Sequence, residues 1–345
     1  MVAMPEPIPE EKVSTKVPHY AVTVIAWILV LAILVSFYFW YSIYFPATNS
    51  KTAVSNNPGY ILMSLSVAAG PQRPYDFDVA KSSFDRSPYN GLSPSASVDG
   101  KYVVWSAGIP HGTAANIAGV FLYNANLATS TLFASGGTGV PETPQLSPHD
   151  TAVVFAEPTA TSSTSNAFFT PSTWNIYFAR TGTAPRVIVH GMYPHWSPSG
   201  RSILYLSDNG LHLYNIASST DYLVWPMAGG SASTRMMLTV SKDGTKLAWT
   251  NPLHEQILIA NITSWSPFKA TEVMRIPVFA FWPVFSPDDN QLAFEQVNWS
   301  TTPSAQPTDP RLTVFNFSSK TIRTLVNLSP FNQMGIFVSD WTTTI

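Results

Sequence analysis

Few residues of this 345-residue chain stand in patterns that support covalent or metal chemistry. The sequence contains no G-x-S-x-G nucleophile motif, no H-E-x-x-H zinc motif, no EF-hand loop and no phosphate-binding glycine loop. It also contains no cysteine, which excludes disulfides, thiolate metal ligands and cysteine nucleophiles. We therefore predict no catalytic residue, no metal site and no cofactor.

Carboxylate pairs are the remaining route to enzyme chemistry. Glycoside cleavage needs two carboxyl groups about 5 to 10 Å apart. Acidic side chains in segments that we predict to be loops can supply such a pair, although nothing in the sequence selects one: Glu142, Glu157, Glu255, Glu295 and Asp309. An extracytoplasmic hydrolase or lyase acting on glycans or lactones is therefore the alternative to a binding protein.

The amino-acid composition further narrows the possible functions of the protein. The 18 basic and 20 acidic residues leave a formal net charge of −2, and charged residues make up only 11% of the chain. Nucleic acid is an unfavourable partner, because binding it requires Lys and Arg to neutralise phosphates. With 45% hydrophobic residues, the chain has enough apolar surface to fold without disulfides.

A short pattern repeats along the chain and indicates its architecture. Each copy has a Ser, a turn containing Pro, Asp or Gly, and then an apolar strand-like run. The copies begin at Ser97, Ser147, Ser197, Ser241 and Ser286, and Asp340-Trp341-Thr342 resembles the start of a sixth. Four antiparallel strands per 44 to 50 residues are typical of a β-propeller blade. An irregular β-sandwich is the alternative.

The clearest copy, Trp196 to Tyr205 with the pattern W-S-P-x-G-x-x-I-x-Y, resembles the TolB-type propeller repeat. The resemblance covers roughly residues 92–345 and implies six blades, with five or seven as alternatives. The sixth blade would combine the C-terminal strand with strands at Tyr60–Val67 and Tyr75–Ala80, which removes the exposed sheet edges. No α/β domain precedes the repeats, so no partner-binding residue is transferred from the family.

Candidate binding residues follow from this architecture. His195 falls on the innermost strand of its blade, and its equivalents, expected to line the central channel, are Ser95, Gln145, Thr239, Val284 and Asp340. The longer loops, 108–113, 157–173 and 295–309, should emerge on one face, where loops commonly carry recognition. The Ser- and Thr-rich loop 157–173 is alternatively simple filler. The predicted ligand- or partner-binding residues are His111, Glu157, Tyr193, His195, Trp225, Glu295, Trp299 and Asp340.

The N-terminal region predicts a membrane anchor. Residues 21–44 carry no charge, and as a helix they span about 36 Å, enough for the roughly 30 Å core of a bilayer. We predict a disordered tail over 1–20, an uncleaved signal-anchor helix over 21–45, a linker over 46–58 and the propeller over 59–345. A cleaved signal peptide and a buried helix are the alternatives.

The charges around the predicted membrane helix indicate on which side of the membrane the propeller lies. Lys12 and Lys16 precede the helix and only Lys51 follows closely, which favours a cytoplasmic N-terminus and an extracytoplasmic propeller. The absence of cysteine favours bacterial export over a eukaryotic ectodomain. We therefore expect a non-catalytic, membrane-anchored scaffold of the cell envelope that binds a protein or, alternatively, a glycan. The same propeller facing the cytoplasm is a further alternative.

Overall fold

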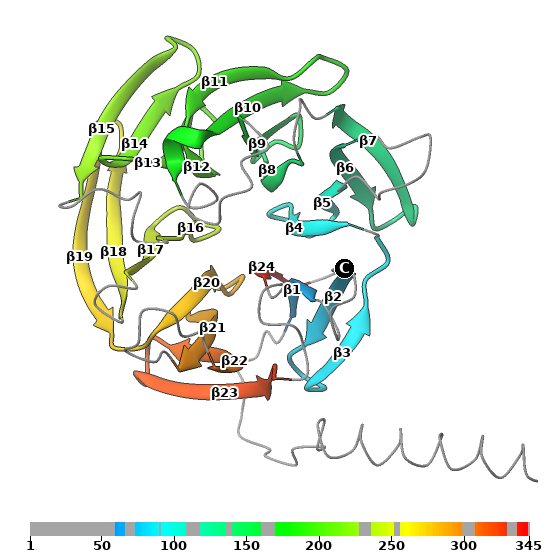
Figure 1. The fold of residues 1–345 in the computed structure, drawn as a ribbon, viewed down its shortest axis with the longest axis vertical. Helices are drawn as coiled ribbons and strands as arrows, with labels where there is room; N and C mark the ends of the chain where they lie inside the picture. Colours follow the sequence, from blue (N-terminus) through cyan, green and yellow to red (C-terminus); the bar gives the residue numbers. More distant parts are fainter. Residues whose placement is uncertain are drawn as a thin grey trace, which may run out of the picture. The chain divides into compact units, whose positions relative to one another are not determined.

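The computed structural model describes residues 59–65, 73–89, 91–107, 118–135, 140–159, 170–227, 236–251, 256–298, 308–329 and 337–343. Within these ranges the strands form six four-stranded antiparallel sheets around a central axis (Figure 1). The predicted six-bladed, all-β propeller is confirmed. The predicted tail, membrane helix and linker lie outside the described residues. Among the described residues, no helix is long and apolar enough to cross a membrane.

Each blade runs from an inner strand beside the central axis to an outer strand at the rim. Blade 1 contains β24 (Phe337–Thr342), β1 (Tyr60–Leu65), β2 (Arg73–Asp78) and β3 (Ser83–Arg86). Blade 2 contains β4 (Leu92–Ala96), β5 (Tyr102–Ala107), β6 (Gly119–Asn124) and β7 (Thr129–Ser135). Blade 3 contains β8 (Glu142–Leu146), β9 (Ala152–Pro158), β10 (Trp174–Arg180) and β11 (Arg186–His190), with a short 3₁₀ helix at Pro171–Thr173.

The other three blades follow in chain order. Blade 4 contains β12 (Met192–Trp196), β13 (Ser202–Ser207), β14 (Gly210–Asn215) and β15 (Thr220–Pro226). Blade 5 contains β16 (Leu238–Val240), β17 (Lys246–Asn251), β18 (Gln256–Trp265) and β19 (Phe268–Ile276). Blade 6 contains β20 (Ala280–Phe285), β21 (Gln291–Asn298), β22 (Thr308–Asn316) and β23 (Thr321–Asn327).

The repeated serine has a structural role in the turn that it begins. In blade 4 the Ser197 Oγ accepts the Ser202 N–H at 3.0 Å, while the Gly200 N–H donates to the Ser197 carbonyl at 2.9 Å. Gly200 has a φ of +66°, which glycine adopts without strain. The hydroxyls of the other four repeat serines accept the same N–H, five residues on, at 2.8 to 3.1 Å. The repeat is therefore a self-capped hairpin turn.

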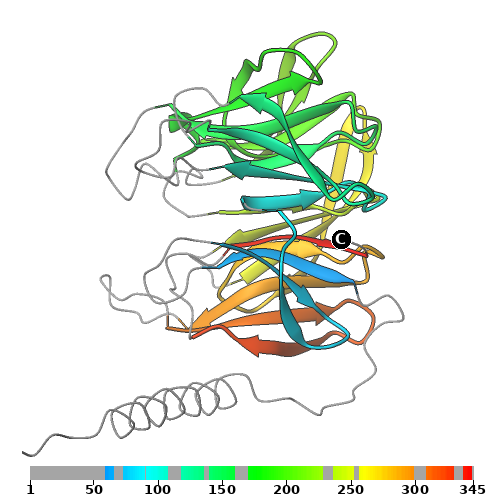
Figure 2. The same ribbon diagram turned by 90° about the vertical axis from the view of Figure 1, so that its right-hand side faces the viewer.

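These turns define two faces of the propeller, which Figure 2 shows from the side. We call the end that carries the turns between inner and second strands the turn face. The connections between second and third strands emerge at the opposite end, the loop face, as predicted. Many residues of the loop-face connections fall outside the described ranges.

The second strand of each blade is buried on both sides, because it is covered by the neighbouring blades. Its second and third residues have no exposed surface in any blade: Ile61 and Leu62, Val103 and Val104, Val153 and Val154, Ile203 and Leu204, Leu247 and Ala248, and Leu292 and Ala293. A continuous apolar pair is the pattern expected where both faces of a strand are buried. These pairs form the packing between blades.

Blade 1 joins the two ends of the propeller. β24 pairs antiparallel with β1, with Tyr60 opposite Thr342 and Leu62 opposite Asp340. The predicted contribution of the N-terminal strands to the last blade is confirmed, although we did not predict the exposed strand β3. This pairing closes the ring and leaves no free inner edge.

Asp340 strengthens this closure from inside the channel. Its Oδ2 accepts the Ala96 N–H at 2.7 Å and the Ser95 hydroxyl at 3.2 Å, both from blade 2. Lys242 of blade 5 reaches across the turn-face end of the channel, where its Nζ lies 2.7 Å from the same oxygen and 3.0 Å from the Ala96 carbonyl. One carboxylate thus connects three blades.

The substitution Asp340→Ala should lower the free energy of unfolding by about 3 kcal/mol, because it leaves Lys242 in the channel without its partner. Denaturant unfolding followed by tryptophan fluorescence measures this loss. The control is Glu272→Gln, which removes the carboxylate of the exposed Arg275–Glu272 pair and should leave the unfolding midpoint nearly unchanged. Equal unfolding midpoints for the two variants would contradict the role of Asp340.

Candidate functional site

The six inner strands enclose a narrow channel that contains two cavities. The predicted channel position is confirmed, because its members line one or both cavities: Ser95, Gln145, His195, Thr239, Val284 and Asp340. The cavity at the turn face holds the Lys242–Asp340 ion pair. The other lies toward the loop face and has a volume of about 50 Å³. We call it the mouth cavity.

A second repeat that we did not predict shapes the mouth cavity. Four inner strands have a β-bulge at a residue followed by proline, and that residue has a positive φ: Ser93 (47°), Thr143 (47°), Tyr193 (52°) and Trp282 (53°). Proline disfavours the right-handed helical region for the residue before it and donates no ladder hydrogen bond. The signal was present in the sequence as X-Pro dipeptides at residues 93, 143, 193 and 282.

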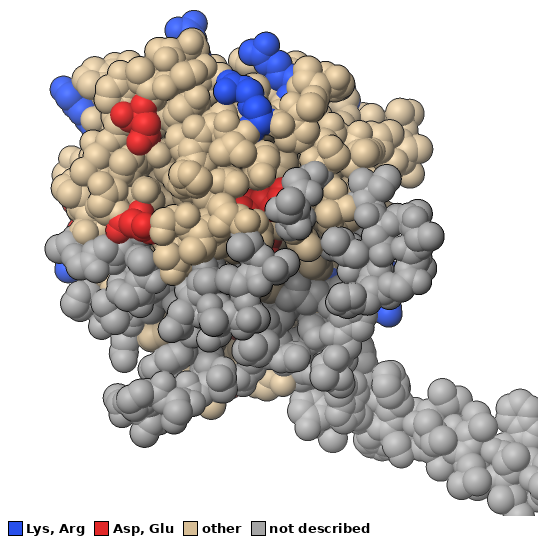
Figure 3. All heavy atoms as spheres, turned by 45° about the horizontal axis from the view of Figure 1, so that its top comes forward, with Lys and Arg blue, Asp and Glu red and all other residues tan. Residues whose placement is uncertain are grey.

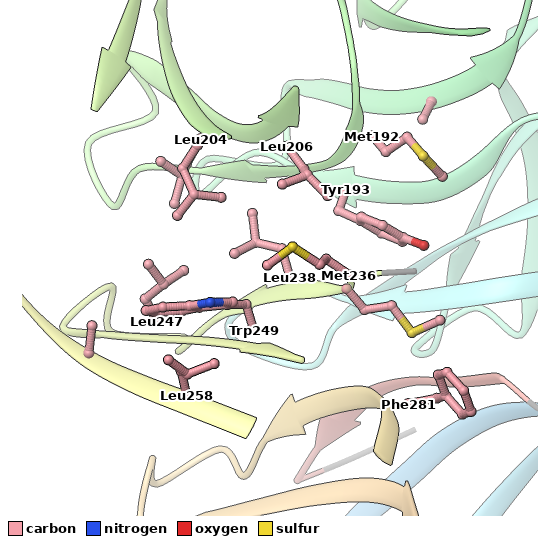
Figure 4. Close-up of a cluster of buried hydrophobic side chains, with 14 of the residues drawn as sticks. Met192, Tyr193, Leu204, Leu206, Met236, Leu238, Leu247, Trp249, Leu258 and Phe281 are labelled. Atoms are coloured by element: carbon pink, nitrogen blue, oxygen red, sulfur yellow. The ribbon is translucent and has the colours of Figure 1, made fainter. Parts of the chain in front are cut away.

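Aromatic and methionine side chains form one side of the mouth cavity. The ring centroids of Tyr193 and Trp282 are 6.1 Å apart, and those of Trp282 and Phe337 are 4.5 Å apart, both edge to face. The main-chain N–H of Trp282 donates to the Met237 sulfur at 3.1 Å. Tyr193 also belongs to the buried hydrophobic cluster that contains Met236 and Phe281, and Figure 4 shows its hydroxyl directed away from the leucines of that cluster.

Two polar side-chain atoms in the lining of the mouth cavity have no partners within the described ranges. The Tyr193 Oη and Thr143 Oγ1 are buried and have no hydrogen-bond partner among the described residues. Burial raises the pKa of Tyr193, and the nearby Glu142 carboxylate raises it further. Burial also raises the pKa of Glu142 to about 7. Unpaired buried polar groups are rare in folded proteins, so this group of atoms indicates a place for a ligand.

The acidic residues expected in loops lie in strands instead. Glu142 begins β8, Glu157 lies in β9 and Glu295 lies in β21, because the ladders continue past the apolar runs into polar residues. Asp309 lies in β22, and Glu255 is outside the described residues. Glu157 and Glu295 are buried, and burial raises the pKa of Glu295 to about 8. Glu142 and Glu295 belong to opposite blades, which does not favour them as a carboxylate pair.

The remaining predicted binding residues have varied surroundings. The His195 Nε2 lies 3.0 Å from the Leu238 carbonyl and donates to it, and desolvation in the channel lowers the pKa of His195 to about 4. Tyr193 is buried rather than exposed, because its bulge turns it into the channel. Trp225 is only partly exposed and packs edge to face against Trp249 at 5.2 Å, outside both cavities. His111 and Trp299 lie outside the described residues.

The described residues contain no group of three His, Asp or Glu side chains arranged to hold a metal ion. The mouth cavity brings together two predicted residues, Tyr193 and His195. It adds Trp282, Phe337 and Met237, which the sequence interpretation missed. This arrangement offers a partly aromatic cavity whose lining includes the unpaired hydroxyl groups of Tyr193 and Thr143.

Comparison with known proteins confirms the fold. No family model matches the sequence, and no curated protein is detectably similar to it. TolB from Acinetobacter baumannii superimposes with a TM-score of 0.58 at 14% identity, covering 84% of this chain and 68% of TolB. An oligogalacturonate lyase from Vibrio parahaemolyticus gives 0.53 at 12% identity, covering 81% of this chain and 83% of the lyase.

A third similar structure belongs to another class of protein. A periplasmic gluconolactonase from Pseudomonas aeruginosa gives a TM-score of 0.50 at 15% identity, covering 77% of this chain and 81% of the lactonase. The three proteins differ in function, and at these identities the likeness shows the fold alone. The predicted resemblance to TolB-type propellers is supported at this level.

Glu295 should make the stability of the propeller depend on pH. Its pKa is raised from 4.5 to about 8, so the folded state holds a proton that the unfolded state releases. Stability contributed by the neutral carboxyl is therefore lost as the pH rises from about 4.5 to 8. Glu295→Gln, which stays neutral, should be more stable than the unsubstituted protein at pH 8 and should lose less stability between pH 5 and 8.

Denaturant midpoints at pH 5, 6.5 and 8 check this expectation. Glu272→Gln, at an exposed carboxylate paired with Arg275, is the control and should follow the pH profile of the unsubstituted protein. An unchanged profile in Glu295→Gln would show that the Glu295 carboxyl is ionised in the folded state.

Proposed function

We propose that this protein is a non-catalytic binding or scaffold module of the cell envelope, anchored by the segment at residues 21–45 and carrying its propeller outside the cytoplasm. Its partner is a protein segment that contacts the loop face and inserts a side chain into the mouth cavity. The rigid ring presents the binding residues, and no covalent step occurs.

The mouth cavity is the observation that carries this proposal. Its volume of about 50 Å³ suits one side-chain group rather than a whole substrate. Aromatic and methionine side chains are enriched at the centres of protein interfaces, where they form pockets for anchoring residues. The unpaired Tyr193 hydroxyl offers the partner a hydrogen bond that the folded propeller does not satisfy by itself.

The sequence supports the placement. The uncharged run at residues 21–44 has the length and composition of a membrane helix, and the basic residues around it favour a cytoplasmic N-terminus. The low charge and the absence of cysteine suit a bacterial protein that functions outside the cytoplasm.

An extracytoplasmic hydrolase or lyase acting on glycans or lactones is the second candidate. The observation that favours it is the pKa of Glu142, about 7, because a carboxyl group that titrates near neutral pH suits general acid–base catalysis. The nearby Tyr193 hydroxyl would be the second proton-transferring group. The described residues contain no group of three His, Asp or Glu side chains that could hold a metal ion beside Glu142.

Tyr193→Phe separates binding from stability. The hydroxyl has no partner among the described residues, so its removal should leave the free energy of unfolding unchanged or slightly higher. Capture of the native partner from solubilised membranes should fall about tenfold, since the partner loses one buried hydrogen bond of ~1.5 kcal/mol. Trp225→Phe, outside the cavity, is the matched control and should retain capture.

Unchanged capture by Tyr193→Phe would contradict the proposed contact. Turnover of oligogalacturonate or a lactone by the full-length protein, abolished by Glu142→Gln, would favour the enzyme instead.

Protease treatment of intact cells tests the placement. A propeller outside the cytoplasm should be degraded in intact cells while a cytoplasmic marker protein survives. The mature protein should also retain residues 21–45 when its N-terminus is sequenced. A propeller that is degraded only after cell lysis would place it in the cytoplasm, and a terminus beyond residue 45 would identify a cleaved signal peptide.

A further inference from the structure

Basic residues are unusually sparse in blades 2 to 4, and those present lie together. Between Lys101 and Arg235 the sequence contains only three basic residues, Arg180, Arg186 and Arg201. All three line one groove on the turn face, between blades 3 and 4. Arg180 and Arg186 flank the β10–β11 turn, while Arg201 lies at the β12–β13 turn. Arginines from two blades therefore meet at one surface groove.

The groove is much larger than the channel cavities. Its volume is about 530 Å³, within the range of small-molecule sites. Phe178 and Ile216 contribute apolar surface, and the exposed Thr183 contributes a hydroxyl. Figure 3 brings the outer side of blades 3 and 4 forward, where only a few charged side chains lie.

Phe178 positions two of the guanidinium groups. The Arg186 and Arg180 guanidinium carbons lie 5.3 and 5.8 Å from the centre of its ring, within the range of cation–π contact. Phe178 is buried and its ring packs edge to face against Trp196 at 6.1 Å, so it is a fixed support. A guanidinium stacked on a ring keeps its N–H edge free for a planar oxyanion.

No carboxylate neutralises these three arginines. Within the described ranges, none of them forms an ion pair or a side-chain hydrogen bond, whereas Arg275 pairs with Glu272 and Arg311 lies 3.6 Å from Asp309. Three like charges at one groove repel each other, and a bound anion would relieve that repulsion. The groove therefore has the charge and the N–H donors of an anion site.

We infer that the groove lined by Arg180, Arg186 and Arg201 binds a small ligand with two or more oxyanion groups of the carboxylate, phosphate or sulfate class. Guanidinium groups bind such oxygens in pairs, and the volume admits a ligand larger than a single inorganic anion. The site is independent of the mouth cavity and of the proposed function, because it lies on the opposite face and shares no residue with it.

The test is calorimetric titration of the full-length protein in nonionic detergent with three probes: sodium sulfate, sodium tripolyphosphate and trigalacturonate. At low ionic strength, tripolyphosphate or trigalacturonate should bind at one site and more tightly than sulfate. Arg201→Gln should weaken that binding about tenfold, the usual effect of losing one charge-assisted hydrogen bond. Arg201→Lys should recover only part of the affinity, because lysine keeps the charge but not the paired N–H donors.

Arg86→Gln is the matched control, since it removes the same charge from an exposed position in blade 1. It should bind the probes as the unsubstituted protein does. Preference for tripolyphosphate would identify a phosphorylated ligand, and preference for trigalacturonate a carboxylated saccharide. Equal losses in Arg86→Gln and Arg201→Gln, or no binding of any probe, would overturn the inference.

Discussion

The pairing of β24 with β1 is the constraint on which the other features of the propeller depend. Without it, the inner edge of blade 1 would be unpaired, and β4 and β20 would lose the neighbour that separates them. Main-chain pairing alone joins only two strands. The Asp340 carboxylate extends the closure to blades 2 and 5 by binding Ala96, Ser95 and Lys242. The chain ends are thus held by a strand ladder and by a partly buried ion pair.

Closure also determines the character of the channel. Six inner strands held this tightly leave only small cavities, so the channel is a packed core rather than a pore. The bulges before proline turn Tyr193 and Trp282 inward at the loop face, where blades without closure would expose them. The aromatic surface of the mouth cavity is therefore a product of ring geometry, and not of any single loop.

Local and repeated features were predictable from the sequence, whereas features that depend on packing between blades were not. The turn at Ser197 is encoded within a few residues, and the blade shared by the two ends follows from counting repeats. The strand β3 escaped prediction because its four residues, Ser83–Arg86, lack apolar alternation. The sequence predicts a loop at Glu295 because carboxyl groups are rarely buried in strands. The burial that makes this position unusual also raises the pKa of Glu295 to about 8.

The two faces of the molecule therefore present different chemistry, and the difference bears on how the protein works. The mouth cavity on the loop face is lined by aromatic, methionine and uncharged polar side chains, so it suits an uncharged group. The arginine groove on the turn face suits anions, and its affinity for them should fall as the salt concentration rises. Because the blades between them are packed on both sides, binding at one face leaves the other face free. With both proposed sites occupied, the rigid ring would hold two partners at once, as the proposed scaffold role requires.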